Sequence, residues 1–494
     1  MSSNIIAAMV GFVALTTMTR FVGDEYGSLM WAMAFAATFN AIADVGFSSA
    51  NVKRISEGQD VNDCISTFLV VKIALTAVMM LATISFFFVY IFLLGNQIYT
   101  ASIFTLLLFV LYWALMNMST VFTSLFKARK ETSKMVSVQL IDPLIRTPVV
   151  VILALGGSTA TELAMAYVLG AAAMVMVGIL LMRRGGIRLV RPTLFRSYLK
   201  FALPLSGIVF LNSLLVNLDI LLLGYFWDNI QVGYYAASFK LVELGLTFGA
   251  AISTLIYPSI SELHRQGDFG SIREVTGQAQ RFVSMVGMPM TVYLAIFAYQ
   301  VANIAFGGGY IDAGGPLTVA AIMLYIALVT GIQGQVLLGC NRPDLLARSK
   351  IMMLVVRVVL LLVFIPASIF GIPMLEMKAT GAALAGLLGW VAFAILVQLF
   401  TYRVARVSVY RRLWIHILAG VMTAAVMLLI SLFIPVEGFF NMLFLAGVTL
   451  AVFLAFLYLL REFTKDDLSL ILEAVDPRKM ARYIKGELGE DRRP

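Results

Sequence analysis

The sequence predicts an all-α protein that crosses a membrane about 14 times. Of its 494 residues, 61% are hydrophobic and only 13% are charged, which is more apolar side chain than a soluble protein of this length can bury. Apolar runs of about 20 residues, the length of a transmembrane helix, recur along the whole chain. A transmembrane β-barrel is excluded, since its strands alternate in polarity over about ten residues each.

The apolar runs divide the chain into fourteen expected helices. The first is somewhat short, and we expect it to be a span rather than a signal peptide, because no basic segment precedes it and no cleavage site follows it. The expected spans are 4–20, 27–51, 64–94, 100–126, 133–155, 160–182, 198–226, 231–259, 276–305, 315–339, 345–370, 380–402, 413–434 and 439–460.

The basic residues give this set of helices an orientation. Of 36 lysines and arginines, 29 fall in alternate loops and in the C-terminal tail, two (Arg20 and Lys378) fall in the opposite loops, and five lie within spans. Cytoplasmic loops carry such an excess, so we expect a multi-pass protein of the cytoplasmic membrane with both termini inside. The loops account for the net charge of +9, and we expect no nucleic-acid partner.

The longest polar inner segment suggests a division into two lobes. We expect an N-lobe of helices 1–6 (1–182), a basic linker (183–200), a C-lobe of helices 7–12 (201–402), helices 13–14 (403–460) and a cytoplasmic tail (461–494), either amphipathic on the membrane surface or disordered. Segments 21–40 and 226–245 both enter a helix after an outer turn, and Gly27 aligns with Gly233. The lobes would therefore be a parallel repeat.

Nine ionisable residues lie inside the expected spans, where charges are costly and usually face a polar cavity. We predict that five cations bind an anionic headgroup and that four acids balance them or couple an ion. The cations are Lys72, Arg146, Lys240, Arg281 and Arg357, and the acids are Asp44, Asp142, Asp219 and Glu243.

Each of these residues also has a purely structural interpretation. Asp142–Arg146 and Lys240–Glu243 have helical spacings that suit pairs within one helix. Arg281 can extend to the inner surface, Asp44 can cap the turn that follows it, and Asp219 can pair with a buried cation for packing alone.

Other residue types restrict the chemistry. Five prolines, at 143, 148, 204, 258 and 289, are expected to interrupt or kink helices. Cys64 and Cys340 are expected to be free thiols, and with only two histidines no metal site is expected. No phosphate-binding loop of the GxxxxGK[ST] type occurs, which argues against direct use of ATP, and we expect no cofactor.

Two stretches of the sequence resemble a known family. YLKFALPLSGIVFLNSLLVNLDILLLGYFWDNIQVGYYAASFKLVE (198–243) is similar to the seventh and eighth helices of the polysaccharide flippases, which belong to the multidrug/oligosaccharidyl-lipid/polysaccharide (MOP) exporter superfamily. Segment 19–54, with Arg20, Gly27, Asp44 and Arg54, resembles the first helical hairpin of that family. The resemblance extends to about residue 460.

The resemblance implies a transporter rather than an enzyme. By alternating access between two lobes, it would pass a lipid-linked oligosaccharide from the inner to the outer leaflet for surface polysaccharide or glycoprotein biosynthesis. The carrier would be a polyprenyl-pyrophosphate or dolichyl lipid. Helices 13 and 14 would take the lipid tail, and glycan-assembly enzymes would be further partners.

Three alternatives stay open: a peptidoglycan-precursor flippase, a multidrug cation antiporter and, more remotely, a membrane polysaccharide polymerase. The antiporters usually have twelve helices, and a polymerase would need catalytic groups in sizeable outer loops, whereas the outer loops expected here are short.

Overall fold

The chain folds almost entirely into α-helices. The computed structural model describes residues 2–44, 46–94, 103–195, 198, 213, 215–434 and 438–463. The first helices are α1 (Ser2–Phe21), α2 (Asp24–Asn40), the 3-10 turn η1 (Ala41–Ala43), α3 (Phe47–Ser56), α4 (Val61–Leu94), α5 (Ile103–Ala128), α6 (Thr132–Leu155) and α7 (Ala160–Arg184). A short helix, Leu215–Phe226, follows.

The second half continues in the same way. Its elements are α9 (Asn229–Gln266), α10 (Phe269–Ile296), α11 (Ala298–Phe306), the 3-10 turn η2 (Gly308–Ala313), α12 (Gly314–Gly339), α13 (Pro343–Phe364), α14 (Lys378–Ala405), α15 (Leu413–Ser431) and α16 (Phe439–Leu459). Between α13 and α14, strands β1 (Ser368–Ile369) and β2 (Ile372–Pro373) pair antiparallel, with Ser368 opposite Pro373.

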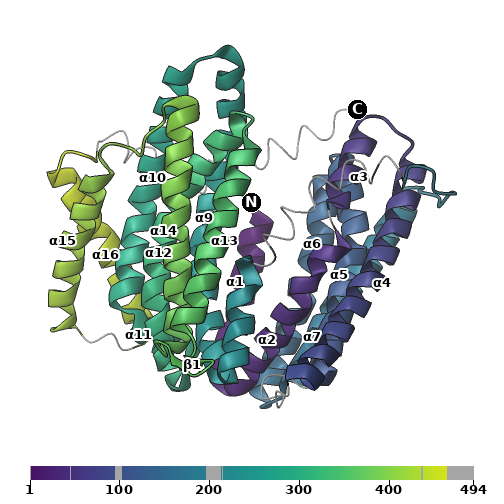
Figure 1. Cartoon of the computed structure of the whole chain (residues 1–494), viewed down its shortest axis with the longest axis horizontal. Coiled ribbons are helices and arrows are strands. Elements are labelled where there is room, and N and C mark those ends of the chain that lie inside the picture. The colour runs from purple at the N-terminus through teal and green to yellow at the C-terminus, as the bar shows by residue number, and fades with distance from the viewer. Residues whose placement is uncertain are drawn as a thin grey trace.

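The helices form two groups, α2–α7 and α9–α16, which lie close at one end of the molecule and further apart at the other (Figure 1). Helix α1 packs on α6 and also contacts α9 and α11. Helices α2 and α9 join the two groups at the close end. There a Cβ atom on Gly27 would lie only 1.7 Å from the Asn229 carbonyl oxygen and 3.0 Å from the Gly233 nitrogen, so only glycine at position 27 permits this approach.

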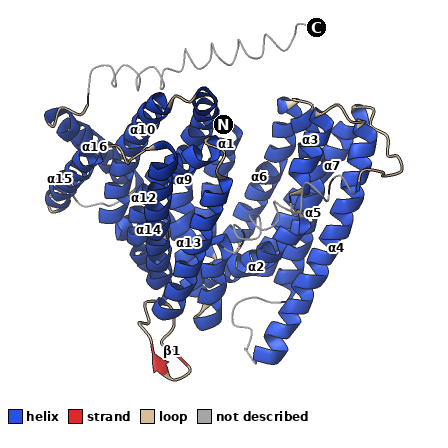
Figure 2. Ribbon diagram, turned by 45° about the horizontal axis from the view of Figure 1, so that its top comes forward, coloured by secondary structure: helices blue, strands red, loops and turns tan. Residues whose placement is uncertain are grey.

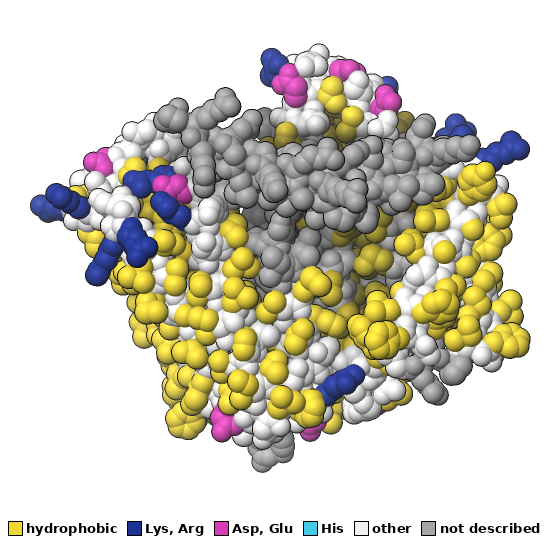
Figure 3. All heavy atoms as spheres, turned by 180° about the vertical axis from the view of Figure 1, so that it is seen from behind, with side chains coloured by type: hydrophobic (Ala, Val, Ile, Leu, Met, Phe, Trp, Pro, Cys, Tyr) yellow, Lys and Arg dark blue, Asp and Glu magenta, His cyan; other side chains and the backbone are white. Residues whose placement is uncertain are grey.

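The outer surface suits a lipid environment. Hydrophobic side chains cover the middle of the face in Figure 3, and charged side chains lie mainly along its upper edge, with a few at the lower edge. Phe92, Phe440 and Leu459 are examples of large apolar side chains that are mostly exposed. A band of this kind marks the part of a protein that contacts acyl chains, so the chain is a multi-pass membrane protein.

Each of the fourteen expected spans overlaps a helix or a pair of helices where it is described, but 345–370 runs past the end of α13 at Phe364 into β1, and the count is not confirmed. Nine helices in the described ranges are long and apolar enough to cross a membrane, or eleven if each bent pair is one span. Two further apolar helices, Met9–Phe21 and Leu215–Phe226, are shorter, and α13 carries Asp344, Arg348, Lys350 and Arg357.

The sharp bends lie at other places than the prolines. Helices α2 and α3 meet at 44° beside Gly46, whose φ of 87° is left-handed, and α10 and α11 meet at 81° around Phe297. By contrast, α6, α9 and α10 continue through their prolines, so the expected interruptions at 143, 148, 258 and 289 are not seen. Neighbouring side chains can satisfy the carbonyls that a proline frees. Pro204 lies outside the described residues.

One apolar core joins the two groups, and others lie within a single group. The shared core contains Trp31, Phe35 and Phe109 of the first group together with side chains of α9, α13 and α14, whereas Leu324 and Phe453 belong to cores within α9–α16. Figure 2 shows that nearly all of this packing is helix against helix, with the β1–β2 hairpin projecting beyond the helices. The polar residues discussed below stand out because they interrupt these apolar cores.

Candidate functional sites in the membrane-spanning helices

Asp219 and Arg357 form a sealed ion pair between two helices. Asp219, on the helix Leu215–Phe226, is fully buried, and only 7% of the Arg357 side chain on α13 is exposed. The guanidinium binds both carboxylate oxygens, with 2.9 Å between Nε and Oδ1, and also donates to the Leu215 carbonyl oxygen at 2.8 Å. The Tyr235 hydroxyl of α9 donates to the same carboxylate. Every charge in this cluster is therefore paired inside the protein.

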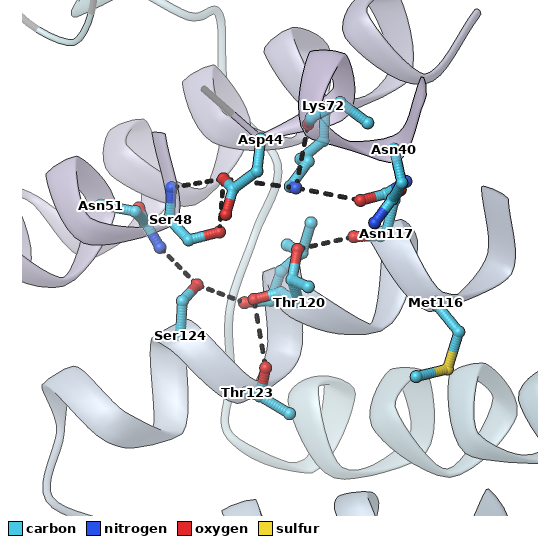
Figure 4. A network of polar contacts seen from close by, with 12 residues as sticks. Asn40, Asp44, Ser48, Asn51, Lys72, Met116, Asn117, Thr120, Thr123 and Ser124 are labelled. Carbon is cyan, nitrogen blue, oxygen red and sulfur yellow. Dashed lines mark hydrogen bonds and ion pairs between the residues drawn. The ribbon is translucent and has the colours of Figure 1, made fainter. Parts of the chain in front are cut away.

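Lys72 of α4 is the centre of a second network, shown in Figure 4. Its fully buried Nζ donates to the Ala43 carbonyl oxygen at 3.0 Å and to Asn117 Oδ1 at 3.3 Å, and it lies 3.4 Å from Asp44 Oδ1. Asp44 also accepts from the Ser48 backbone at 3.0 Å and from its hydroxyl at 2.8 Å, so it caps α3 after the bend. The lysine thereby ties the α2–α3 bend to α4 and α5.

Asp142 and Arg146 form an intrahelical pair on α6, with 3.2 Å between Oδ2 and Nη2. The guanidinium also lies over the ring of Tyr167 on α7, 4.5 Å from its centre. Asp142 Oδ1 is buried and has no hydrogen-bond partner among the described residues. A Cβ atom on Gly170 would lie 2.6 Å from this oxygen, so a glycine in α7 makes room for the carboxylate.

A cavity of about 290 Å³ lies between the Lys72 network and the Asp142–Arg146 pair, at α2, α5, α6 and α7. Its lining includes three amide side chains and three hydroxyls, together with Asp142: Asn40, Asn117 and Gln139, and Ser119, Thr120 and Thr123. Trp113 supplies an aromatic wall. The Asn117 amide donates to Asn40 Oδ1 at 2.7 Å, so the Lys72 network fixes one side of the cavity. We refer to this space as the N-lobe cavity.

Lys240 and Glu243 form the most exposed pair of the set. They lie 2.7 Å apart on α9, with 52% and 60% of their side chains exposed. An exposed ion pair this far along a membrane helix indicates contact with water rather than with lipid.

Arg281 belongs to a different region. It lies in α10 and binds Glu462, which follows α16, with 3.2 Å between Nε and Oε1 and 2.7 Å between Nη2 and the Glu462 carbonyl oxygen. Glu462 is buried and also accepts from the Tyr410 hydroxyl at 2.7 Å and from Arg412 at 3.1 Å. This cluster fastens the end of α16 to α10 and to the segment before α15.

The nine predicted residues are thus spread over five pairs and do not surround one pocket. Asp219 is bound to Arg357 rather than to Lys240, and Arg281 is bound to Glu462, a residue that sequence reasoning missed. Glu462 could have been noticed as an acid directly after the last expected helix, at the inner surface where most of the arginines are expected. Whether any of the nine residues contacts a substrate stays a prediction. Within the described residues, no cluster of His, Cys, Asp and Glu could hold a metal ion.

The two lobes place an arginine in corresponding positions. Arg146 and Arg357 lie in α6 and α13, the fifth expected helix of each lobe. Each packs against a glycine of the next helix, since a Cβ on Gly170 would lie 3.0 Å from Arg146 Cβ and one on Gly389 would lie 3.4 Å from Arg357 Cβ. This correspondence agrees with the internal repeat predicted from Gly27 and Gly233.

Comparisons with known protein sequences identify related proteins. A family model described as "Polysaccharide biosynthesis protein" matches residues 17–314. A curated protein of Haloferax volcanii, "Probable low-salt glycan biosynthesis flippase Agl15", is 22% identical over 148 residues, which are 30% of this chain and 31% of that protein. The matched part is therefore less than a third of the relative's length.

Solved structures share the fold over most of the chain. The lipid II flippase MurJ in an inward closed conformation superposes with a TM-score of 0.74 at 12% identity, covering 92% of this chain and 98% of its own. An inward-facing multidrug resistance transporter of the MATE family, in the MOP superfamily, gives 0.63 at 14% identity over 81% of this chain and 96% of its own. These proteins are transporters and flippases, in agreement with the expectation that the chain is not an enzyme.

Proposed function

Since the chain belongs to the family of polysaccharide biosynthesis proteins and has the fold of MOP-superfamily transporters, we propose that it is a lipid-linked oligosaccharide flippase. It would carry its substrate from the inner to the outer leaflet of the cytoplasmic membrane, for surface polysaccharide or glycoprotein biosynthesis. The carrier would be a polyprenyl pyrophosphate or a dolichyl lipid. The observation that carries the proposal is the exposed Lys240–Glu243 pair in the first half of α9.

Lys240 is the cation best placed to meet an anionic headgroup. Lys72 and Arg357 are buried and fully engaged, whereas more than half of the Lys240 side chain is exposed. A flexible ammonium binds phosphate oxygens as a point charge. Glu243 would hold Lys240 in place when no substrate is bound, and the pyrophosphate would compete with it for the ammonium.

The N-lobe cavity supplies groups that suit the glycan. The hydroxyls of Thr120 and Thr123 donate to backbone carbonyls of their own helix, which leaves their lone pairs free to accept from sugar hydroxyls. Among the described residues, no cation lines the cavity and Asp142 is its one charged residue, so this lining favours a polyhydroxyl group over a phosphate. A volume near 290 Å³ is at the small end of ligand pockets and suits a single sugar ring.

The arrangement of the lobes supports alternating access. The repeat-related glycines Gly27 and Gly233 meet where α2 crosses α9, and a backbone contact of this kind can act as a pivot. From this crossing the two groups of helices diverge toward the side on which we expect both termini and the cytoplasm (Figure 1). Helices α15 and α16, which are apolar and lie outside the two lobes, would accommodate the lipid tail.

Vesicle assays with matched lysine variants test the proposal. The gene is deleted in its own host, and the sidedness of lipid-linked sugars is measured in inverted membrane vesicles. We expect the glycan to accumulate on the cytoplasmic leaflet, wild-type protein to reverse this, and Lys240→Gln to restore less than a tenth of the wild-type rate. Lys127→Gln, which removes an exposed lysine at the end of α5, is the control.

Other outcomes would favour the alternatives. Normal sidedness with shortened glycans would indicate a polymerase. Accumulation of peptidoglycan precursor would indicate a precursor flippase, and normal glycans with sensitivity to cationic drugs would indicate an antiporter. Full activity of Lys240→Gln would remove Lys240 from the mechanism.

A further inference from the structure

A second cavity, of about 600 Å³, lies at the opposite edge of the C-lobe from the α2–α9 contact. Its lining residues lie near the C-terminal ends of α9 and α14 and around the turn between α12 and α13, all at the expected cytoplasmic surface. Three arginines, Arg342, Arg348 and Arg403, contribute to the lining, together with His264. We refer to this space as the basic inner cavity.

Two arginines of this cavity have no acidic partner among the described residues. Arg342 is engaged by Asp344, with two contacts of 3.0 Å. For Arg348 and Arg403 no ion pair is found in the described part of the chain, and no carboxylate of that part lines the cavity. The C-terminal ends of α9 and α14 favour nearby cations, but that effect acts within a turn of each helix. It does not explain why arginines from two helices converge on one hollow.

A histidine joins the arginines in this lining. His264 lines the cavity, although its Nδ1 is closed to solvent and has no hydrogen-bond partner among the described residues.

Apolar side chains share the lining of the cavity with the arginines. They are Leu345, Phe400 and Val404. A lining that combines arginines with apolar side chains suits an amphiphile whose charged headgroup binds the arginines and whose tail runs between the helices. Basic pockets between transmembrane helices on the cytoplasmic side bind phosphate headgroups in this manner.

We propose that the basic inner cavity binds the phosphate headgroup of an anionic lipid at the cytoplasmic surface. Arg348 and Arg403 contact the phosphate. Two sources share this chemistry: an ordinary anionic phospholipid, which would stabilise the C-lobe, and a polyprenyl pyrophosphate, which would bind here before it enters the passage between the lobes. The site does not depend on the proposed flippase activity, because it is defined by its own lining.

Lipid binding to the full-length purified protein tests the proposal. Phosphatidylglycerol, undecaprenyl pyrophosphate and zwitterionic phosphatidylcholine are titrated separately, and bound lipid is counted by native mass spectrometry. The double variant Arg348→Gln/Arg403→Gln is compared with Arg183→Gln/Arg184→Gln, which removes two exposed arginines from the end of α7 on the same expected side. The two variants lose equal charge, so they differ only in the cavity.

We expect the cavity variant to bind at least one anionic lipid about tenfold more weakly and the control variant to bind it as the wild type does. A loss for phosphatidylglycerol would identify a phospholipid site, and a loss restricted to undecaprenyl pyrophosphate would identify a site for the carrier. Equal losses in both variants would reduce the effect to surface charge and overturn the proposal. Wild-type binding by the cavity variant, or no preference of the wild type for anionic lipids over phosphatidylcholine, would overturn it as well.

Discussion

Removal of the buried carboxylate of Asp219 should destabilise the C-lobe strongly. In Asp219→Ala, the Arg357 guanidinium loses both of its carboxylate contacts and keeps only the Leu215 carbonyl oxygen and the Tyr235 hydroxyl. Because the side chain is almost fully buried, water cannot replace the lost partner. Breaking a buried pair on one side costs about 3–5 kcal/mol, and we expect a loss of this size.

The chain contains its own reporter for this measurement. Cys64 and Cys340 are free and buried, so a thiol-reactive fluorophore labels them when the helices separate on heating. Asp219→Ala should lower the midpoint of labelling markedly, whereas the double variant Asp219→Leu/Arg357→Met, which removes both charges, should recover most of the loss. A midpoint for Asp219→Ala equal to that of the wild type would refute the reasoning. It would mean that water or a neighbouring group replaces the lost carboxylate without a loss of stability.

Three further predictions follow from individual contacts. Gly27→Val places atoms against the Asn229 carbonyl oxygen and should lower the labelling midpoint by the equivalent of about 1–3 kcal/mol. Gly11→Val is the control, because a side chain there meets nothing within 4 Å, and equal effects of the two changes would contradict the close contact of α2 and α9. Glu462→Gln weakens the charged hydrogen bonds of Arg281 and Arg412 and should lower the same midpoint by about 1.5–3 kcal/mol, with Glu376→Gln on an exposed loop as its control. Lys240→Gln should leave the midpoint within about 1 kcal/mol of the wild type, because the pair is more than half exposed, and a large drop would assign Lys240 to packing.

The sequence predicted those features that depend on short distances along the chain. Helices follow from the length of apolar runs, and the pairs Asp142–Arg146 and Lys240–Glu243 follow from the spacing of residues on one helix face. The bond between Asp219 and Arg357 could not be predicted in this way, because 138 residues separate them and the contact depends on which helices pack together. Sequence reasoning therefore left Arg357 without a partner.

Two other features were missed for related reasons. Glu462 was assigned to the polar tail, although the structure buries it beneath Arg281 and Arg412. The N-lobe cavity was not predicted as a site, because the predicted site residues were all ionisable and neutral residues such as Asn117 and Gln139 were not among them. A neutral amide inside a membrane helix is a weaker signal than a charge, but the cavity shows that several amides and hydroxyls on neighbouring helices can line a single polar space.

The exposure of each pair separates structural charges from candidates for transport. Asp219 does not face lipid at all: it joins the short helix Leu215–Phe226 to α13, and Tyr235 adds α9 to the same contact. A buried ion pair is no more stabilising than apolar side chains of the same size, so its advantage would be that it fixes how these leucine-rich helices align. The variant Asp219→Leu/Arg357→Met tests this interpretation, since it should keep most of the thermal stability and yet transport more slowly than the wild type. Unchanged transport by a stable double variant would show that the apolar surfaces alone align the helices.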